Sequence, residues 1–168
     1  MSMVRNPVEA LQESFGDAIR KVEEFRGEIS VTVDKSKIRE VMFFLRDNGN
    51  FLYDMLIDLC GVDYCGDAQR FEIVYLLRSS RFGNRITIKA RLQENEDVDT
   101  VMDIWMAADW LEREVYDVLG IKFNNHSDLR RILLPDEFVG HPLRKDFPVQ
   151  GYDFEKPFSV QLEEESNG

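Results

Sequence analysis

The sequence predicts an α+β fold, a two-layer sandwich whose mostly antiparallel or mixed sheet carries helices on one face, followed by an extended C-terminal tail. Two kinds of periodicity lead to this fold class. Apolar residues alternate with polar ones, as is typical of strands, at 28–33, 71–77 and 85–92. They recur every three or four residues, as is typical of helices, at 8–22, 38–45 and 111–119.

The first helix is expected to begin at Asn6-Pro7, because Asn is a favoured N-cap and Pro a favoured first helical residue. Its apolar stripe continues to Gly27 through Val8, Leu11, Phe15, Ala18 and Val22. After the strand at 28–33, Asp34 can cap a second helix that ends at Asn48-Gly49.

The middle of the chain predicts a hairpin. Residues 51–60 are mostly apolar and fit either a helix or a strand. The strands at 71–77 and 85–92 flank the turn dipeptide Gly83-Asn84, so we expect them to pair antiparallel.

A third helix is expected near Asp109, because Asp109 and Glu112 have the spacing of a capping box. Its inward side would carry Leu111, Val115, Val118 and Leu119. Gly120 would end it. The apolar stretch 131–134 predicts one more short strand.

The chain divides into a folded domain at residues 1–134 and an extended, partner-docking tail at 135–168. Proline and glycine recur beyond residue 134, and no helical or strand period survives there. Because proline lacks the N–H that a strand ladder requires, we do not expect this tail to build a sheet of its own.

Composition excludes several classes of function. The formal net charge is -11, so a nucleic acid is not an expected partner. No apolar run reaches the roughly 18 residues of a membrane-spanning helix, and the first residues lack the pattern of a secretory signal or transit peptide. Cys60 and Cys65 are the only cysteines, too few for an iron–sulfur cluster; we expect them to be buried, reduced thiols, and we expect no metal site.

Charged residues concentrate on the third helix. Arg113 and Asp117 have the spacing of a surface ion pair. Glu114, beside Trp110, would lie half-buried, where it could act as a general acid; we favour a set of ion pairs that fixes the helix. His126 and His141 follow or precede turn-forming residues, so we interpret them as hydrogen-bonded loop residues rather than metal ligands or bases.

The segment from His141 to Pro148 carries Arg144, Lys145, Asp146 and Phe147 between two prolines. Arginine suits bidentate carboxylate contacts, and an aromatic ring on a stiff segment suits anchoring at an interface. The sequence therefore favours a peptide that lies on a partner, with a solvated linker as the alternative.

Motifs between Trp105 and Pro148 resemble one family. They are Trp110-Leu111-Glu112-Arg113-Glu114, Asp117, Gly120-Ile121, His126, Leu129 to Leu133, and Pro142 to Pro148. In this order and spacing they resemble the thirty-kilodalton subunit of respiratory complex I, known in bacteria as the C subunit of NADH-quinone oxidoreductase. The resemblance extends more weakly back to Leu59. The chain departs from the family pattern at Asp109, Leu119 and Asn125.

This resemblance implies a structural, cofactor-free subunit in the peripheral arm of a proton-translocating NADH-quinone oxidoreductase. The subunit would pack on the forty-nine-kilodalton subunit near the quinone site, and its tail would wrap that neighbour. FMN, iron–sulfur clusters and quinone would belong to partner subunits. Membrane association would be indirect, on the cytoplasmic side of the cell membrane. The resemblance implies no catalytic, cofactor-binding or metal residues, and interface or structural roles for Trp110, Glu112, Arg113, Glu114, Asp117, His126, Arg130, Arg131, Pro142, Arg144, Lys145, Asp146 and Phe147.

Three alternatives remain at this point. The chain could be the equivalent subunit of a related membrane-bound hydrogenase or ferredoxin-quinone reductase. It could be a free-standing hydrolase that uses Glu114, His126 and His141. It could also be a free-standing adaptor for charged proteins.

Overall fold

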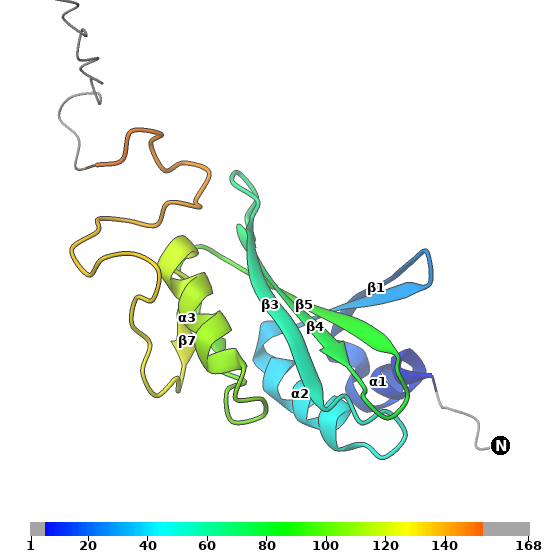
Figure 1. The fold of residues 1–168 in the computed structure, drawn as a ribbon. Helices are drawn as coiled ribbons and strands as arrows, with labels where there is room; N and C mark the ends of the chain where they lie inside the picture. Colours follow the sequence, from blue (N-terminus) through cyan, green and yellow to red (C-terminus); the bar gives the residue numbers. More distant parts are fainter. Residues whose placement is uncertain (1–5, 153–168) are drawn as a thin grey trace, which may run out of the picture.

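A computed structural model describes residues 6–152, which form a five-stranded sheet in the order β1-β2-β5-β4-β3 (Figure 1). Its strands are β1 (Ile19–Phe25), β2 (Glu28–Val33), β3 (Met55–Asp63), β4 (Phe71–Arg78) and β5 (Arg85–Leu92). β2 and β5 pair in parallel, and the other neighbours pair antiparallel. The mixed sheet confirms the predicted fold class.

Helices cover one face of this sheet. They are α1 (Pro7–Phe15), α2 (Ile38–Asp47) and α3 (Ala108–Leu119). The side chains of β4 and β5 that face the helices are fully buried, including Ile73, Tyr75, Ile86 and Ile88. The intervening positions on the other face, such as Val74 and Lys89, stay partly exposed. Together these patterns describe a two-layer sandwich.

α3 lies against the edge strand β3 because Gly61 provides room for it. A Cβ atom at Gly61 would lie 2.4 Å from Leu119 Cδ1 and 3.2 Å from Val115 Cγ1. The helix therefore approaches the strand more closely than any side chain at position 61 would allow.

The predicted first helix is too long. α1 ends at Phe15, a short 3-10 turn covers Gly16–Ala18, and residues 19–25 form β1 instead of continuing the helix. Arg26 and Gly27 both have positive φ, 53° and 83°, and Phe25 pairs directly with Glu28. A two-residue turn of this kind matches the twist of paired strands, so the hairpin overrides the helical spacing of Ala18 and Val22.

The other expected elements vary in outcome. The strand at 28–33, α2, the β4–β5 hairpin and α3 with its end at Gly120 are confirmed. The ambiguous segment becomes the edge strand β3. The predicted strand at 131–134 is wrong; a short parallel pair, β6 (Val98–Asp99) and β7 (Phe123–Asn124), forms elsewhere. None of the described helices is long and apolar enough to cross a membrane.

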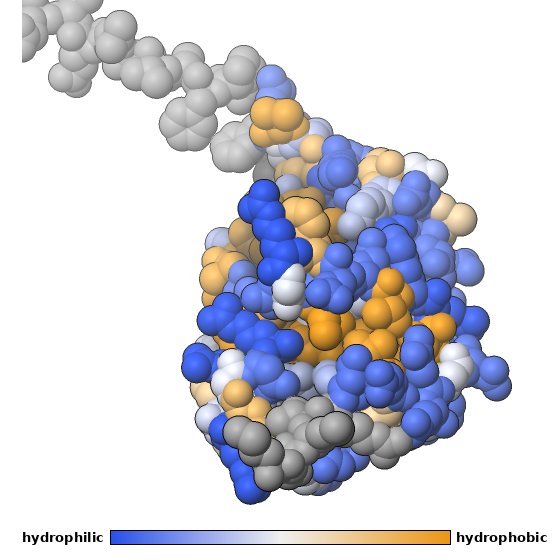
Figure 2. Space-filling view, turned by 90° about the vertical axis from the view of Figure 1, so that its right-hand side faces the viewer, coloured by the Kyte–Doolittle hydropathy of each residue, from blue (hydrophilic) through white to orange (hydrophobic). Residues whose placement is uncertain are grey.

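Figure 2 shows one side of the molecule, where apolar side chains gather in the middle and hydrophilic side chains surround them. Large apolar side chains are also exposed at both ends of the described chain, for example Phe25 at the β1–β2 turn and Tyr152 near its end. Single large apolar side chains are therefore exposed in several parts of the structure.

Candidate functional site

Residues 135–152, called the strap below, run past the C-terminal end of α3 and the β3–β4 turn (Figure 1). The strap has turns and bends but no helix or strand. It is nevertheless attached to the domain at three places, which are Arg131, bound to the Asp117 carboxylate, the end of α3, and Arg70.

The first attachment is a loop that wraps around the Asp117 carboxylate. Oδ2 of Asp117 accepts three consecutive backbone N–H groups, those of Ile132, Leu133 and Leu134, at 3.0, 2.7 and 2.9 Å. Oδ1 accepts from Arg131 Nη1 at 2.6 Å. Burial alone would raise the pKa of Asp117, but these donors outweigh it and hold the pKa below its usual value. Because these amides point at a carboxylate, they cannot form the ladder of the strand predicted here.

Arg131 carries this attachment into the strap. Its Nη2 donates to the carbonyl oxygens of Phe138 and Gly140, at 2.9 and 3.0 Å. One guanidinium therefore joins Asp117 on α3 to two points of the strap, with the fork geometry that distinguishes arginine from lysine.

The second attachment is the C-terminal end of α3. The last carbonyl groups of a helix lack partners within the helix. The strap supplies donors to three of them: His141 Nδ1 to Asp117, Leu143 N–H to Val118, and Arg144 Nε to Leu119, at 2.9, 3.0 and 2.7 Å. The strap thus acts as the C-terminal cap of α3. The Arg144 charge also lies at the helix end where a cation is favoured.

Gly120 provides the surface on which the strap rests. Its φ is +76°, and a Cβ there would lie 2.5 Å from the His141 ring and 2.8 Å from Arg144 Nη2. Both the backbone conformation and the close approach therefore require glycine. Burial lowers the pKa of His141. Its Nδ1 must carry the proton, because the carbonyl oxygen of Asp117 can only accept.

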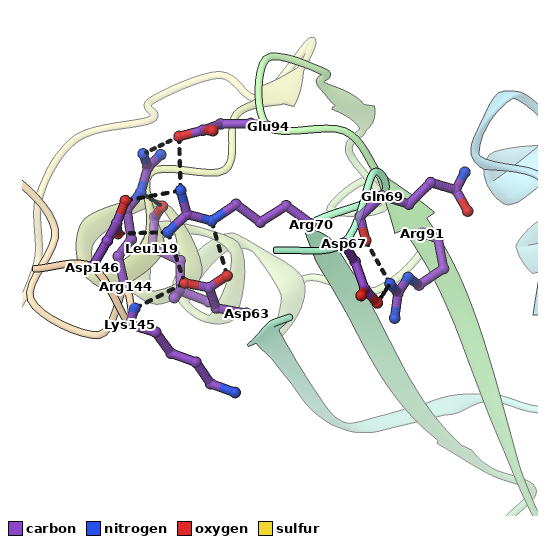
Figure 3. A network of polar contacts seen from close by, with 10 residues as sticks. All are labelled: Asp63, Asp67, Gln69, Arg70, Arg91, Glu94, Leu119, Arg144, Lys145 and Asp146. Carbon is purple, nitrogen blue, oxygen red and sulfur yellow. Dashed lines mark hydrogen bonds and ion pairs between the residues drawn. The ribbon is translucent and has the colours of Figure 1, made fainter. Parts of the chain in front are cut away.

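The third attachment is Arg70, at the start of β4, with its carboxylate partners (Figure 3). Arg70 is 8% exposed and binds Asp63 through two parallel hydrogen bonds of 2.9 Å each. It also pairs with Glu94 at 2.9 Å and with Asp146 of the strap at 2.5 Å. The bond to Arg70 lowers the pKa of Asp63, and Asp63 in turn raises the pKa of Arg70. We call these four residues the Arg70 cluster.

Two strap residues beside Asp146 complete this attachment. Arg144 Nη1 reaches Glu94 at 3.3 Å, and the backbone N–H of Lys145 donates to Asp63 Oδ2 at 2.8 Å. The Lys145 side chain points away from the Arg70 cluster (Figure 3) and is exposed. At this attachment the strap is therefore held by the Lys145 backbone and by the side chains of Arg144 and Asp146, and the Lys145 side chain remains accessible.

Several large apolar side chains of this region are exposed. Residues exposing more than half of a large apolar side chain include Leu133, Val139, Leu143, Val149 and Tyr152. Phe147 instead packs within the strap, 6.0 Å from Phe138 and 5.1 Å from Tyr152 between ring centroids. The strap thus binds its own domain through polar groups and exposes several apolar side chains to solvent.

The start of α3 is organised differently. Ala107 occupies the N-cap position without a side-chain bond, so the predicted capping box is wrong. Glu112 is fully buried and accepts from Val101 N–H at 2.8 Å and from the Thr100 hydroxyl. Burial raises the pKa of Glu112 to about 7, against the effect of these two bonds, and neighbouring Asp109 adds to the rise.

The predicted Arg113–Asp117 ion pair is also wrong. Arg113 donates to the carbonyl oxygens of Arg130 and Arg131, both at 3.2 Å, and its guanidinium lies 5.1 Å from the Trp110 ring centroid. Trp110 packs against this guanidinium and is 60% exposed. Asp117 binds Arg131 instead. Arg131 comes from the same loop whose carbonyl oxygens accept hydrogen bonds from Arg113.

The residues considered for catalysis do not meet. Glu114 is exposed and not half-buried, so the expected environment of a general acid is absent at this position. His126 contacts Asp109 near the start of α3, and His141 contacts Asp117, eight residues later. That separation corresponds to about 12 Å along a helix.

The remaining predictions concern single positions. Arg130 pairs with Asp128 at 3.0 Å on the surface, and Pro142 is partly buried. Cys60 and Cys65 are exposed, so the expectation that they are buried is wrong. Cys60 is exposed because it lies on the sheet face opposite the helices. In residues 6–152 no group of three or more His, Cys, Asp or Glu side chains could hold a metal ion.

No sequence pattern indicates that Arg70, Glu94 and Thr100 belong to the site. Arg70 lies 24 residues from Glu94 and 76 from Asp146. Thr100 lies 12 residues from Glu112. None of these spacings matches a helical or strand period, so only the three-dimensional structure reveals the contacts.

The comparisons with known proteins agree with one another. The family profile described as "Respiratory-chain NADH dehydrogenase, 30 Kd subunit" matches residues 31–153. The chain is 47% identical over 154 residues to the C subunit of the NADH-quinone oxidoreductase of Geobacter sulfurreducens, covering 90% of this chain and 93% of that protein. It is 48% identical over 153 residues to the protein of the same name from Geotalea uraniireducens, covering 90% and 92%.

A solved structure shares the fold. One chain of the membrane-bound sulfane sulfur reductase, an archaeal respiratory membrane complex, aligns with a TM-score of 0.72 and 21% identity. The alignment covers 94% of this chain and 95% of that chain. At this identity the likeness supports the fold alone.

Proposed function

Since the chain belongs to the 30 Kd subunit family of respiratory-chain NADH dehydrogenase, we propose that it is a non-catalytic structural subunit of a proton-translocating NADH-quinone oxidoreductase. The premise is supported by both the family profile and relatives that match nearly the full chain. The role of this particular chain rests on the strap.

The proposal rests on the strap, in which one set of groups binds the domain and another set is exposed. Its backbone and the side chains of His141, Arg144 and Asp146 bind the domain. The side chains of Leu143, Val149 and Tyr152 are exposed. A segment fixed in this way loses little further conformational freedom when a partner binds, which favours affinity. We propose that the partner is the forty-nine-kilodalton subunit, near the quinone site.

The chemistry would then belong to other subunits. We propose that FMN, the iron–sulfur clusters and quinone are held by partners, and that this chain reaches the cytoplasmic side of the cell membrane through the assembled complex. Glu114, His126 and His141 are dispersed over α3, the loop after β7 and the strap, which supports this interpretation over a free-standing hydrolase. The relatives' names favour it over a hydrogenase or ferredoxin-quinone reductase subunit and over a free-standing adaptor.

Leu143→Asp tests the proposal. Leu143 is 64% exposed, so the chain should fold normally, and a charge at the centre of the apolar surface should lower the amount of assembled complex several-fold. The measurement is native gel analysis and co-purification of flavin- and cluster-containing subunits from membranes. Folding of the purified chain is checked by circular dichroism.

The matched control is Phe25→Asp, which places the same charge at a side chain that is 71% exposed on the β1–β2 turn. It should leave assembly unchanged. Normal assembly with Leu143→Asp, or an equal loss with Phe25→Asp, would contradict the proposed docking surface. Arg144→Glu is a poor test, because Arg144 holds the strap on its own domain.

A further inference from the structure

Glu112 is a buried carboxylate without a close cation. It is fully buried, and its two hydrogen-bond donors, Thr100 and Val101, are neutral. Among residues 6–152, the nearest group that could carry a positive charge is the imidazole of His126, whose Nε2 lies 3.9 Å from Glu112 Oε2. A lone buried charge is costly, so this arrangement favours a proton on some member of the group.

The surroundings of Glu112 add negative charge. Asp109 comes from α3 itself, and Asp103 comes from the loop before it. Asp103 is paired with Arg39 of α2, at the surface. Oδ1 of Asp109 is buried and has no hydrogen bond among the described residues, although His126 Nε2 lies 3.3 Å away.

Two further titratable groups face this region from the sheet and from β6. The Tyr75 hydroxyl, on β4, is buried without a hydrogen-bond partner in the described structure. Burial, and then the charges of Glu112 and Asp99, raise the pKa of Tyr75 well above its usual value. Tyr75 therefore stays neutral and adds no charge to this region.

The hydrogen bonds of His126 decide where the proton resides. Its Nδ1 lies 3.1 Å from the backbone N–H of Asp128, so it accepts that bond and carries no proton. Its Nε2 lies 3.2 Å from the carbonyl oxygen of Asp109, so it donates. His126 is therefore the neutral Nε2–H tautomer, and a second proton would leave the Asp128 amide without its acceptor.

We propose that Glu112 is a site that gains and loses a proton, and that the bound proton tightens the attachment of residues 99–105 to α3. In the ionised state the Thr100 hydroxyl donates to Oε2. When Oε2 takes up a proton from water it donates to Thr100 Oγ, which already accepts from Met102 N–H and has a second lone pair. Val101 N–H keeps its bond to Oε1, so the contacts persist and only the interior charge disappears.

The sign of the pH effect follows from the raised pKa of Glu112, about 7 in the folded chain. The folded state prefers the protonated carboxyl more than the unfolded state does. The resulting stabilisation is fully present below the ordinary glutamate pKa of about 4.3 and is lost as the pH rises through about 7. Residues 99–105 should therefore open more often at alkaline pH.

NMR spectroscopy of the full chain, labelled with carbon-13 and nitrogen-15, tests the site directly. The Glu112 carboxyl carbon should titrate with a midpoint near 7, and the ring nitrogens of His126 are recorded in the same series. The sequence has only two histidines, and His141, with its proton on Nδ1, provides the opposite tautomer as an internal reference. A Glu112 midpoint at the ordinary glutamate value, or protonation of His126 in its place, would overturn the proposal.

Hydrogen exchange tests the consequence, with Glu112→Gln and Glu114→Gln as a pair. A glutamine amide at 112 can accept from Val101 N–H and donate to Thr100 Oγ, as the protonated carboxyl does. After correction for intrinsic exchange, the wild type should protect the 99–105 amides several-fold less at alkaline than at acidic pH, and Glu112→Gln should abolish that difference. Glu114 is exposed on the same helix, so Glu114→Gln should retain it. A pH difference that survives Glu112→Gln would refute the linkage, and the wild-type titration decides the site even where this variant fails to fold.

Discussion

The two halves of α3 each bury a carboxylate, and the pKa values of these two groups are shifted in opposite directions. Near the start of the helix, Glu112 has two neutral donors and acidic neighbours, and burial raises its pKa to about 7. Near the end, Asp117 has three amide donors and Arg131, and its pKa lies below the usual value. Both side chains are fully buried.

Burial alone therefore does not determine the ionisation of a carboxylate; the number and charge of its donors decide. The Asp117 carboxylate organises a loop and the strap through a permanent negative charge. Glu112 organises the loop before α3 through contacts that a neutral carboxyl can also make. The stability of the end of α3 should accordingly not change with pH near neutrality, whereas the stability of its start should change.

Asp117→Ala should have the largest effect on stability. Removing the carboxylate leaves Arg131 and three amides without their shared acceptor, which should lower the free energy of unfolding by about 3–5 kcal/mol at neutral pH. Because the pKa of Asp117 is lowered, its contribution is present above the ordinary aspartate pKa of about 3.9 and is lost as the pH falls through the lowered value. Urea unfolding at several pH values should show the gap to wild type closing in acid; a gap constant with pH would refute the ionised state assigned here.

Gly120→Ala should have an intermediate effect. A left-handed φ costs a non-glycine residue about 1–2 kcal/mol, and the new methyl group would displace His141 and Arg144 from the end of α3. We expect faster proteolysis within the strap, measured by mass spectrometry of limited digests. Gly27→Ala provides the control, because Gly27 also has a positive φ but no atom near its missing Cβ. Equal strap cleavage in both variants would show that the strap does not depend on Gly120.

Asp109→Asn should have the smallest effect on stability, within about 0.5 kcal/mol, but should change the pKa of Glu112. The Asp109 charge raises the pKa of Glu112, so neutralising it should lower that pKa toward the ordinary value. The Glu112 carboxyl carbon titration reports the change, and Asp128→Asn, on the surface, should leave the titration unchanged.

The regular elements were largely predictable where a period is local. Strict alternation located β2, β4 and β5, and a well-spaced apolar stripe located α2. The first helix was extended too far because Ala18 and Val22 happen to continue its spacing, whereas Arg26-Gly27 builds a hairpin that only pairing with β2 can stabilise. The strand expected at 131–134 failed because its amides bind Asp117.

The candidate site was predictable as a set of residues but not as a set of contacts. The motif residues Glu112, Arg113 and Asp117 are central to the structure, yet the partners assigned to them from helical spacing were wrong. The true partners lie on loops before and after the helix. The proposal that Pro142 to Phe147 dock on a partner stays a prediction, while their contacts with the chain's own domain are a finding.

The 76 residues between Arg70 and Asp146 also affect how the protein is made. During translation, N-terminal regions fold first, so all five strands of the sheet emerge from the ribosome before the strap. Until Asp146 arrives, Arg70 has only Asp63 and Glu94 as acidic partners among the residues described, and the end of α3 lacks its cap. Nascent chains that stop before residue 141 would thus carry all five strands and α3, but none of the strap donors that cap the end of this helix.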